Sequence, residues 1–327
     1  MADAPDLLPI AREAVTRAHR IIRSRAPSSV TEKSERDIVT DIDLAVEDTV
    51  RDFLSRETPR IGILGEEHGR TGPPGDDLWW VLDPVDGTAN LARGIPLCAV
   101  SLALVRARRG VLAVIDLPFL DVTYTAATGH GAYAGGDPIH ASTVGDLSEA
   151  LISVGDFAIG PDSAIVNRLR IDLLATLGAR ARKIRMLGTA AIDLAWVAEG
   201  KLDASIILAN APWDTTAGVL LVREAGGIVL DRDDTDHTTD SSATLAISPA
   251  LREPIMTIFH QAVRRTATSR HGHGDPSAGG PAGGEEGHQQ GGTHGDQDGQ
   301  RQRGDGRRTA YAGTDSTGRA LKVDEPG

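Results

Sequence analysis

Acidic side chains occur at four places where a predicted strand ends or a predicted helix begins. They are Asp41/Asp43, Glu66/Glu67, Asp83/Asp86 and Asp214. Apolar runs lead directly into the second and third places, so we expect these carboxylates at the rim of a buried sheet. Carboxylates that converge repel one another unless a cation lies among them. Because these groups offer oxygen ligands without Cys or His, the pattern favours Mg²⁺ over zinc.

The segment Asp83–Thr88 is the most informative of these places. We expect Pro84 to stiffen a turn in which both aspartates and the Val85 carbonyl face one point. Gly87 allows close approach of the backbone, and the N–H groups that follow it can point at an anion. Carboxylates for metal beside amides for phosphate are an arrangement typical of phosphatases, in which two metal ions activate water and stabilise the leaving oxygen.

The elements that position these groups follow from apolar periodicity. Helices are predicted over 7–25, 43–54, 163–177, 189–199 and 215–225. Strands are predicted over 61–64, 79–82, 99–106, 111–117, 121–127, 131–133, 150–154, 183–186, 204–208 and 228–230. This order predicts an α+β fold, with an N-terminal α+β half (1–137) that carries the metal site and a C-terminal α/β half (138–265).

Composition excludes several classes of protein. The 327 residues include 34 Lys and Arg and 46 Asp and Glu, a formal net charge of -12. This charge argues against nucleic acid or an anionic membrane as a partner. No apolar run reaches the length of a membrane helix, and the first residues do not resemble a secretory signal. Cys98 is the single cysteine, so we expect no intrachain disulfide, a buried thiol and a cytoplasmic protein.

Residues 266–327 differ sharply from the rest of the chain. They are rich in Gly, His and Gln and nearly lack apolar side chains. Such a segment cannot bury enough apolar surface to offset its ordering entropy, so we expect a disordered tail. Its histidines could bind metal, but a solvated tail is the favoured interpretation.

Five segments, in collinear order, resemble the inositol monophosphatase family. They are the D-x-V-T-x-x-D element Asp37–Asp43, Gly65-Glu66-Glu67, the run from Trp80 to Asn90, Gly188-Thr189-Ala190-Ala191, and Trp213–Gly218. The resemblance covers about residues 7–263, and five ordered matches are far more specific than any one. It implies a layered αβαβα sandwich of the inositol monophosphatase / fructose-1,6-bisphosphatase type, a homodimer and a lithium-sensitive, Mg²⁺-dependent phosphatase.

The resemblance also implies roles for individual residues. The first Mg²⁺ would be held by Glu66, Asp83 and the Val85 carbonyl, and the second by Asp83, Asp86 and Asp214, with a third, weaker ion near Glu66. The implied catalytic residues are Thr88, Asp43 and Glu66, where Thr88, bonded to Asp43, orients the attacking water. The implied substrate-binding residues are Glu66, Val85, Asp86, Gly87, Thr88, Gly188, Thr189, Ala190 and Asp214. Lys33 resembles a lysine that the family places near the metal. We expect Asp41, by contrast, only to cap its helix.

One departure bears on the substrate. Family members selective for inositol phosphate carry a Glu seven residues before the last Asp, and counting back from Asp214 gives Ile207. We therefore expect hydrolysis of a small polyol or cyclitol monophosphate, with histidinol phosphate or an aminocyclitol phosphate of antibiotic biosynthesis as alternatives.

Two other classes of protein remain as alternatives. A haloacid-dehalogenase-type phosphatase has a similar D-x-D-G-T motif, but two residues separate Asp83 from Asp86 here, where that motif has one. A metal-stabilised binding protein without activity is the non-enzymatic alternative, and the presence of every matched ligand argues against it.

Overall fold

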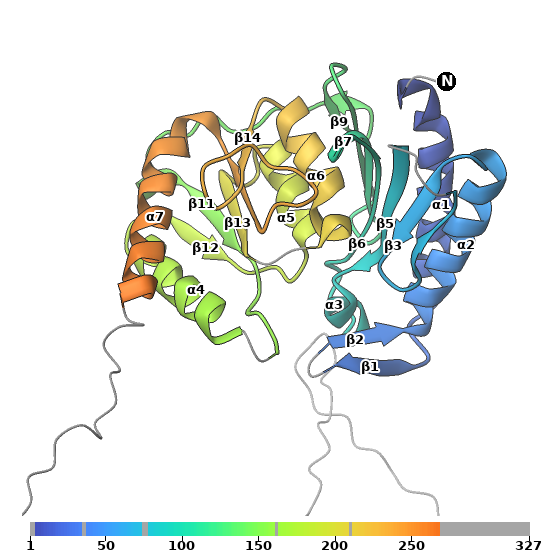
Figure 1. The fold of residues 1–327 in the computed structure, drawn as a ribbon, viewed down its shortest axis with the longest axis horizontal. Helices are drawn as coiled ribbons and strands as arrows, with labels where there is room; N and C mark the ends of the chain where they lie inside the picture. Colours follow the sequence, from blue (N-terminus) through green and yellow to red (C-terminus); the bar gives the residue numbers. More distant parts are fainter. Residues whose placement is uncertain (1–3, 35–36, 74–77, 161–162, 209–210, 269–327) are drawn as a thin grey trace, which may run out of the picture. The chain divides into compact units, whose positions relative to one another are not determined.

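Five alternating layers of helix and sheet make up the described part of the chain (Figure 1). The computed structural model describes residues 4–34, 37–73, 78–160, 163–208 and 211–268, all within one compact unit, Met1–Gly274. The α-helices are α1 (Leu8–Ser24), α2 (Asp41–Glu57), α3 (Thr88–Ala92), α4 (Ser163–Gly178), α5 (Ala190–Ala198), α6 (Pro212–Glu224) and α7 (Arg252–Thr268). None of the helices in these ranges is long and apolar enough to cross a bilayer.

The first sheet is an antiparallel meander with one parallel pair. Its strands are β3 (Gly62–Gly65), β4 (Gly69–Thr71), β5 (Leu78–Asp86), β6 (Ala99–Arg106), β7 (Arg109–Leu117), β8 (Val122–Ala127), β9 (Ala132–Ala134) and β10 (Asp137–Pro138). They lie in the order β10-β9-β8-β7-β6-β5-β3-β4, with β3 and β5 parallel. A separate hairpin, β1 (Val30–Ser34) and β2 (Asp37–Thr40), precedes α2.

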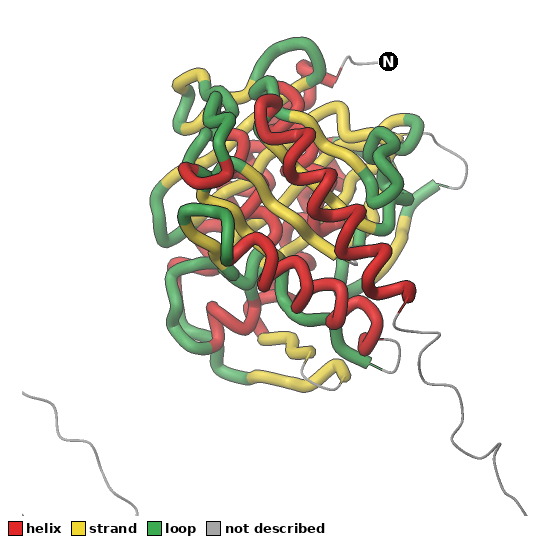
Figure 2. The backbone as a smooth tube through the Cα atoms, turned by 90° about the vertical axis from the view of Figure 1, so that its left-hand side faces the viewer, coloured by secondary structure: helices red, strands yellow, loops and turns green. Residues whose placement is uncertain are grey.

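The second sheet is smaller and mixed. Its strands are β11 (Leu151–Val154), β12 (Lys183–Arg185), β13 (Ala204–Leu208), β14 (Ile228–Leu230) and β15 (Ala243–Ile247). In the order β12-β11-β13-β15-β14, the first three strands are parallel and β15 is antiparallel to both neighbours. Figure 2, seen from the α4/α7 side, shows these two helices covering the sheet.

Three apolar cores lie between the layers. Successive side chains of a strand point to opposite faces of its sheet, so one strand contributes to two cores. On β5, Trp80 and Leu82 face α1 and α2, whereas Val81 faces α5 and α6. The faces of β13 and β15 that point away from α5 and α6 pack against α4 and α7. This helix–sheet–helix–sheet–helix order confirms the predicted αβαβα sandwich.

Several predicted boundaries were wrong. The strand predicted over 79–82 continues to Asp86, so Pro84 lies in β5 rather than in a turn. The pairing of β5 with β6 is irregular between Asp83 and Asp86, where a proline that lacks an N–H is tolerated. Strand β15 and helix α7 were not predicted. Because α7 continues to Thr268, residues 266–268 are helical rather than part of the tail, and 269–327 lie outside the described residues.

The hairpin between β6 and β7 is tighter than predicted. Its turn contains only Ala107 and Arg108, with φ of 47° and 67°, where four residues were expected. Two consecutive positive φ values are typical of a type I′ turn, whose twist matches that of the flanking strands.

Candidate active site

A pocket of about 200 Å³ brings most of the predicted site residues together. It is lined by Asp37, Ile38, Glu66, Asp83, Val85, Asp86, Gly87, Thr88, Ala89, Gly188 and Asp214. In the described ranges, no three acidic, His or Cys side chains form a ready-made metal cluster. These carboxylates line one pocket, but in this structure they are not arranged as a metal cluster.

Three aspartates, Asp83, Asp86 and Asp214, form the inner part of this pocket. Backbone amides hold them: Asp83 accepts from Val85 N at 3.0 Å, and Asp214, in the first turn of α6, accepts from Ala211 N at 2.7 Å. No Lys, Arg or His of the described residues forms an ion pair with any of the three. We name these side chains the inner aspartates.

Burial strongly raises the pKa of each inner aspartate. Burial and then the charge of Glu66 raise the pKa of Asp83 well above its usual range. Burial raises the pKa of Asp86 to about 6, although hydrogen bonds from the start of α5 oppose it, and the pKa of Asp214 to about 7. Each shift shows that the charged carboxylate is insufficiently stabilised, which is the environment a bound cation would relieve.

The outer part of the site consists of Glu66 and Glu67, in the turn between β3 and β4. Lys33 Nζ donates to Glu66 Oε1 at 2.8 Å and to Glu67 Oε1 at 2.6 Å. Burial alone would lower the pKa of Lys33, but these two hydrogen bonds and the charges of both glutamates together outweigh it and raise that pKa. We name Glu66 and Glu67 the outer glutamates; of the two, only Glu66 lines the pocket.

The turn that carries the outer glutamates is built around a buried ion pair that sequence analysis missed. Glu47 on α2 is fully buried; it accepts from Glu67 N at 2.8 Å and from His68 N at 3.0 Å. Arg51 Nε donates to the same carboxylate at 2.7 Å, and the rest of its guanidinium donates hydrogen bonds to Thr71 Oγ1 and to the carbonyl oxygen of Gly69. A Cβ at Gly65 would collide with Glu47. The Glu–Arg spacing of four on a helix was the available signal.

Thr88 and Asp43 are in contact, as expected. Thr88 Oγ1 lies 2.7 Å from Asp43 Oδ1 and 2.9 Å from the Val85 carbonyl oxygen, and its single proton can be donated to one of them at a time. Asp43 is fully buried and also accepts from the backbone and side chain of Thr40.

The prediction that Asp41 caps its helix was wrong. Thr40 is the N-cap of α2, and Asp43, at the third helical position, completes the capping box. Asp41 instead accepts from Ser28 and Ser29 and pairs with Arg25, and these hydrogen bonds, that of Ser28 first, lower its pKa.

Close backbone contacts fix the wall of the pocket at Gly87. Gly87 has a φ of 95°, and a Cβ there would lie 2.8 Å from the Leu97 carbonyl oxygen, so no other residue fits without a shift. Asn90 Nδ2 lies 2.8 Å from the carbonyl oxygens of both Leu97 and Leu187. Asn90 therefore ties α3 to the segment that delivers Gly188.

The Gly188–Ala191 segment buttresses Asp86. Gly188 lines the pocket, whereas Thr189, the N-cap of α5, donates to Asp86 Oδ2 at 2.7 Å. Ala191 N also donates to Asp86, and the Ala190 amide contributes to its stabilisation. The structure thus places Thr189 and Ala190 behind a carboxylate and not on the pocket surface.

An acidic residue that the sequence analysis did not single out lies near Gly188. Ile207 lies in the core with α5 and α6 and does not line the pocket. Asp156, in the exposed loop after β11, directs Oδ2 to within 3.4 Å of the place where a Cβ on Gly188 would lie. Cys98 is buried as predicted, and burial raises its pKa to about 12, so it is not a nucleophile.

Comparisons with known proteins agree with this geometry. A family model described as the inositol monophosphatase family matches residues 3–264. The chain is 36% identical over 259 residues to the inositol-1-monophosphatase ImpA of Mycolicibacterium smegmatis (79% of this chain, 91% of that protein). It is 35% identical over 229 residues to the Nus factor SuhB of Escherichia coli K12 (69% and 85%). An IMPase structure from Thermotoga maritima superposes with a TM-score of 0.73 at 27% identity (80% and 99%).

Proposed function

We propose, from the premise that this chain belongs to the inositol monophosphatase family, that it hydrolyses a small polyol or cyclitol monophosphate with Mg²⁺. Membership of that family makes it a phosphatase that acts on small phosphate monoesters. The observation that carries the proposal is the set of inner aspartates, Asp83 buried and Asp86 and Asp214 half-buried, which face one pocket with raised pKa values and form no ion pair with a described residue.

The donor set fits a hard divalent cation. Ions would be held by Glu66, Asp83, the Val85 carbonyl, Asp86 and Asp214, which offer oxygen atoms alone. Bound there, Mg²⁺ would neutralise charge on the phosphate and make water more acidic.

In this proposal, Thr88 orients the attacking water. When its hydroxyl proton points to Asp43, the lone pairs of Thr88 Oγ1 are left to accept a hydrogen bond from water. Asp43 holds that orientation because Thr40 and the α2 capping box fix its carboxylate. The backbone around Gly87 allows close approach of a phosphate, and attack in line would then proceed without a phosphoenzyme.

Asp156 favours a second candidate substrate, an aminated polyol phosphate. With Ile207 buried in the core, no carboxylate reaches the leaving group from β13, whereas Asp156 is exposed beside Gly188 and has no ion-pair partner in the described ranges. A carboxylate at this position would pair with an ammonium group more strongly than with a hydroxyl. The homodimer, the lack of nucleic-acid or membrane partners and the cytoplasmic location stay predictions.

Phosphate release with Mg²⁺ over a panel of esters tests both candidates. The panel is inositol 1-phosphate, histidinol phosphate, fructose 1,6-bisphosphate and an aminocyclitol phosphate. We expect one ester to be turned over far faster than the rest and a chelator to abolish it; no turnover of any ester would contradict the proposal. If the aminated ester is preferred, Asp156→Asn should raise its KM while kcat and the KM for inositol 1-phosphate stay unchanged.

A further inference from the structure

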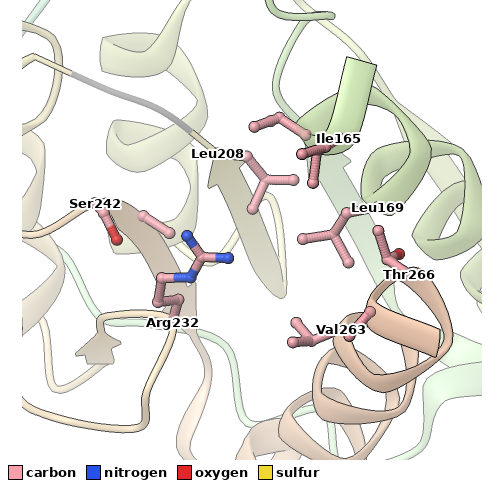
Figure 3. Close-up of a pocket in the computed structure, with 10 residues that line it drawn as sticks. Ile165, Leu169, Leu208, Arg232, Ser242, Val263 and Thr266 are labelled. Carbon is pink, nitrogen blue, oxygen red and sulfur yellow. The ribbon is translucent and has the colours of Figure 1, made fainter. Parts of the chain in front are cut away.

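A second cavity, of about 690 Å³, lies away from the carboxylate pocket and shares no lining residue with it. Helices α4 and α7, the end of β13 and the segment between β14 and β15 enclose it (Figure 3). Its walls are mostly apolar and include Ile165, Leu169, Leu208 and Val263. This volume is within the range of small-molecule binding sites, which are clefts or cavities of about 300–1,000 Å³.

One charged side chain lines this cavity. Arg232 lies across the cavity from Leu169 and Val263, and its guanidinium points toward Leu208 (Figure 3). No hydrogen bond or ion pair joins that guanidinium to any described residue, and none of the described residues that line the cavity is acidic. The guanidinium is therefore available to an anion.

The backbone that carries Arg232 is held in place before any ligand arrives. Asp231 accepts from Arg232 N at 2.7 Å, from Ala243 N at 3.0 Å and from Ser242 N at 3.2 Å. Three residues further on, Asp234 pairs with Arg252 at 2.7 Å and so joins the loop to the start of α7. Such a fixed loop reduces the ordering cost of binding.

We propose that this cavity binds a small amphipathic anion, a carboxylate attached to an apolar body. The apolar walls would gain from burying a hydrocarbon or aromatic group, and the planar guanidinium matches a carboxylate with two parallel hydrogen bonds. A polyol phosphate is the wrong ligand here, since its hydroxyl groups would be buried without hydrogen-bond partners. This site is therefore chemically distinct from the pocket of the proposed phosphatase reaction.

Octanoate and octan-1-ol test the proposal on the full chain, because they share an apolar body and differ in charge. Saturation-transfer NMR titration should show octanoate binding at least about fivefold more tightly than octan-1-ol. Arg232→Ala should remove that preference by weakening octanoate alone, whereas Arg12→Ala, an equal charge change on the exposed face of α1, should leave both affinities unchanged. Ala267→Trp, which fills the cavity, should weaken both ligands.

Two results would overturn the proposal. One is equal binding of octanoate to the Arg232→Ala and Arg12→Ala proteins; the other is no binding of either ligand at millimolar concentration. Because Arg232 is exposed and unpaired within the described chain, its removal should leave the melting temperature unchanged. Phosphate release by all variants should equal that of the wild type, so failure of this inference is distinguishable from failure of the proposed phosphatase function.

Discussion

The inner aspartates and the outer glutamates are both acidic groups of one site, but among the described residues only the glutamates pair with a cation. The outer glutamates share the ammonium of Lys33, at 2.8 and 2.6 Å. The inner aspartates receive only neutral donors, such as Val85 N and Thr189 Oγ1. Burial raises the pKa of each inner aspartate, and it also raises the pKa of Glu67 although Lys33 opposes it. Among the described residues, the two groups therefore differ in the ammonium partner, which the outer glutamates have and the inner aspartates lack.

The comparison indicates where a cation gains most. An ion among the inner aspartates would remove a standing electrostatic penalty, whereas an ion at Glu66 must compete with an ammonium already in place. We infer that the inner site binds metal more tightly than a site that depends on Glu66 alone.

The largest expected effect is the loss of an inner carboxylate. Asp83→Asn should lower kcat about a thousand-fold or more, which corresponds to about 4 kcal/mol. In the absence of metal it should also raise the melting temperature, because it removes a buried charge that burial penalises. Glu67→Gln is the matched control, since Glu67 does not line the pocket; it should retain activity within a few-fold. Equal losses of kcat in the two variants would show that the inner and outer groups do not differ in their contribution to activity.

The next effect concerns the support of the outer glutamates. Glu47→Ala leaves Arg51 and the amides of Glu67 and His68 without their buried acceptor, and breaking such a pair costs about 3–5 kcal/mol. Urea unfolding should show this loss, and a smaller loss in the Glu47→Ala/Arg51→Leu double variant. The folded fraction of Glu47→Ala should need a higher Mg²⁺ concentration for half-maximal activity. The activity of Asp83→Asn, by contrast, should not rise with added Mg²⁺. An unchanged Mg²⁺ requirement would show that Glu47 does not position Glu66.

Asp193 offers a buried carboxylate outside both groups. Burial raises its pKa to about 8, and no hydrogen-bond partner reaches Oδ1 in the described residues. Between pH 4 and 8 the folded state keeps a proton that the unfolded chain releases, so stability falls as pH rises, by at most about 1.4 kcal/mol per pH unit. Asp193→Asn should make this slope shallower by the contribution of Asp193, while the inner aspartates keep theirs. The midpoints of urea unfolding at pH 6 and pH 8 measure this slope. If the midpoint changes equally with pH in the wild type and the variant, the pKa of Asp193 is not raised.

The smallest effect tests whether Lys33 is what separates the two groups. Lys33→Met leaves Glu66 and Glu67 without their cation, so the metal-free protein should lose about 1 kcal/mol or less, because the pair is partly exposed. Mg²⁺ should then raise the melting temperature more than it does in the wild type. A smaller metal-induced rise would mean that Lys33 assists binding instead of competing with it.

The layered fold and the members of the site were predictable from the sequence, but the way in which they are held was not. Short apolar runs located the strands that deliver Glu66 and Asp83. The start of a predicted helix marked Asp214, and the resemblance implied that it binds metal. The sequence could not show that Glu47 closes the Glu66 turn, because a Glu–Arg pair four residues apart usually lies on a solvated helix face.

Two smaller errors have the same cause. Asp41 and Thr40 are both good N-cap residues, and only the contact of Asp41 with Ser28 and Ser29 decides between them. Pro84 suggests a turn, but an irregular strand pairing accommodates it equally well. In each case a contact between segments far apart in sequence overrides a local preference.

Helix α6 has a further consequence, because it brings Asp214 from the C-terminal part of the chain to carboxylates that the N-terminal part supplies. Asp83, Asp86 and Glu66 all precede residue 138, and α6 packs its buried face on the first sheet. A chain cut between β10 and β11 would leave each fragment with an incomplete set of ligands. Phosphate release would then return only when the two fragments associate, so activity would report that both are present and assembled.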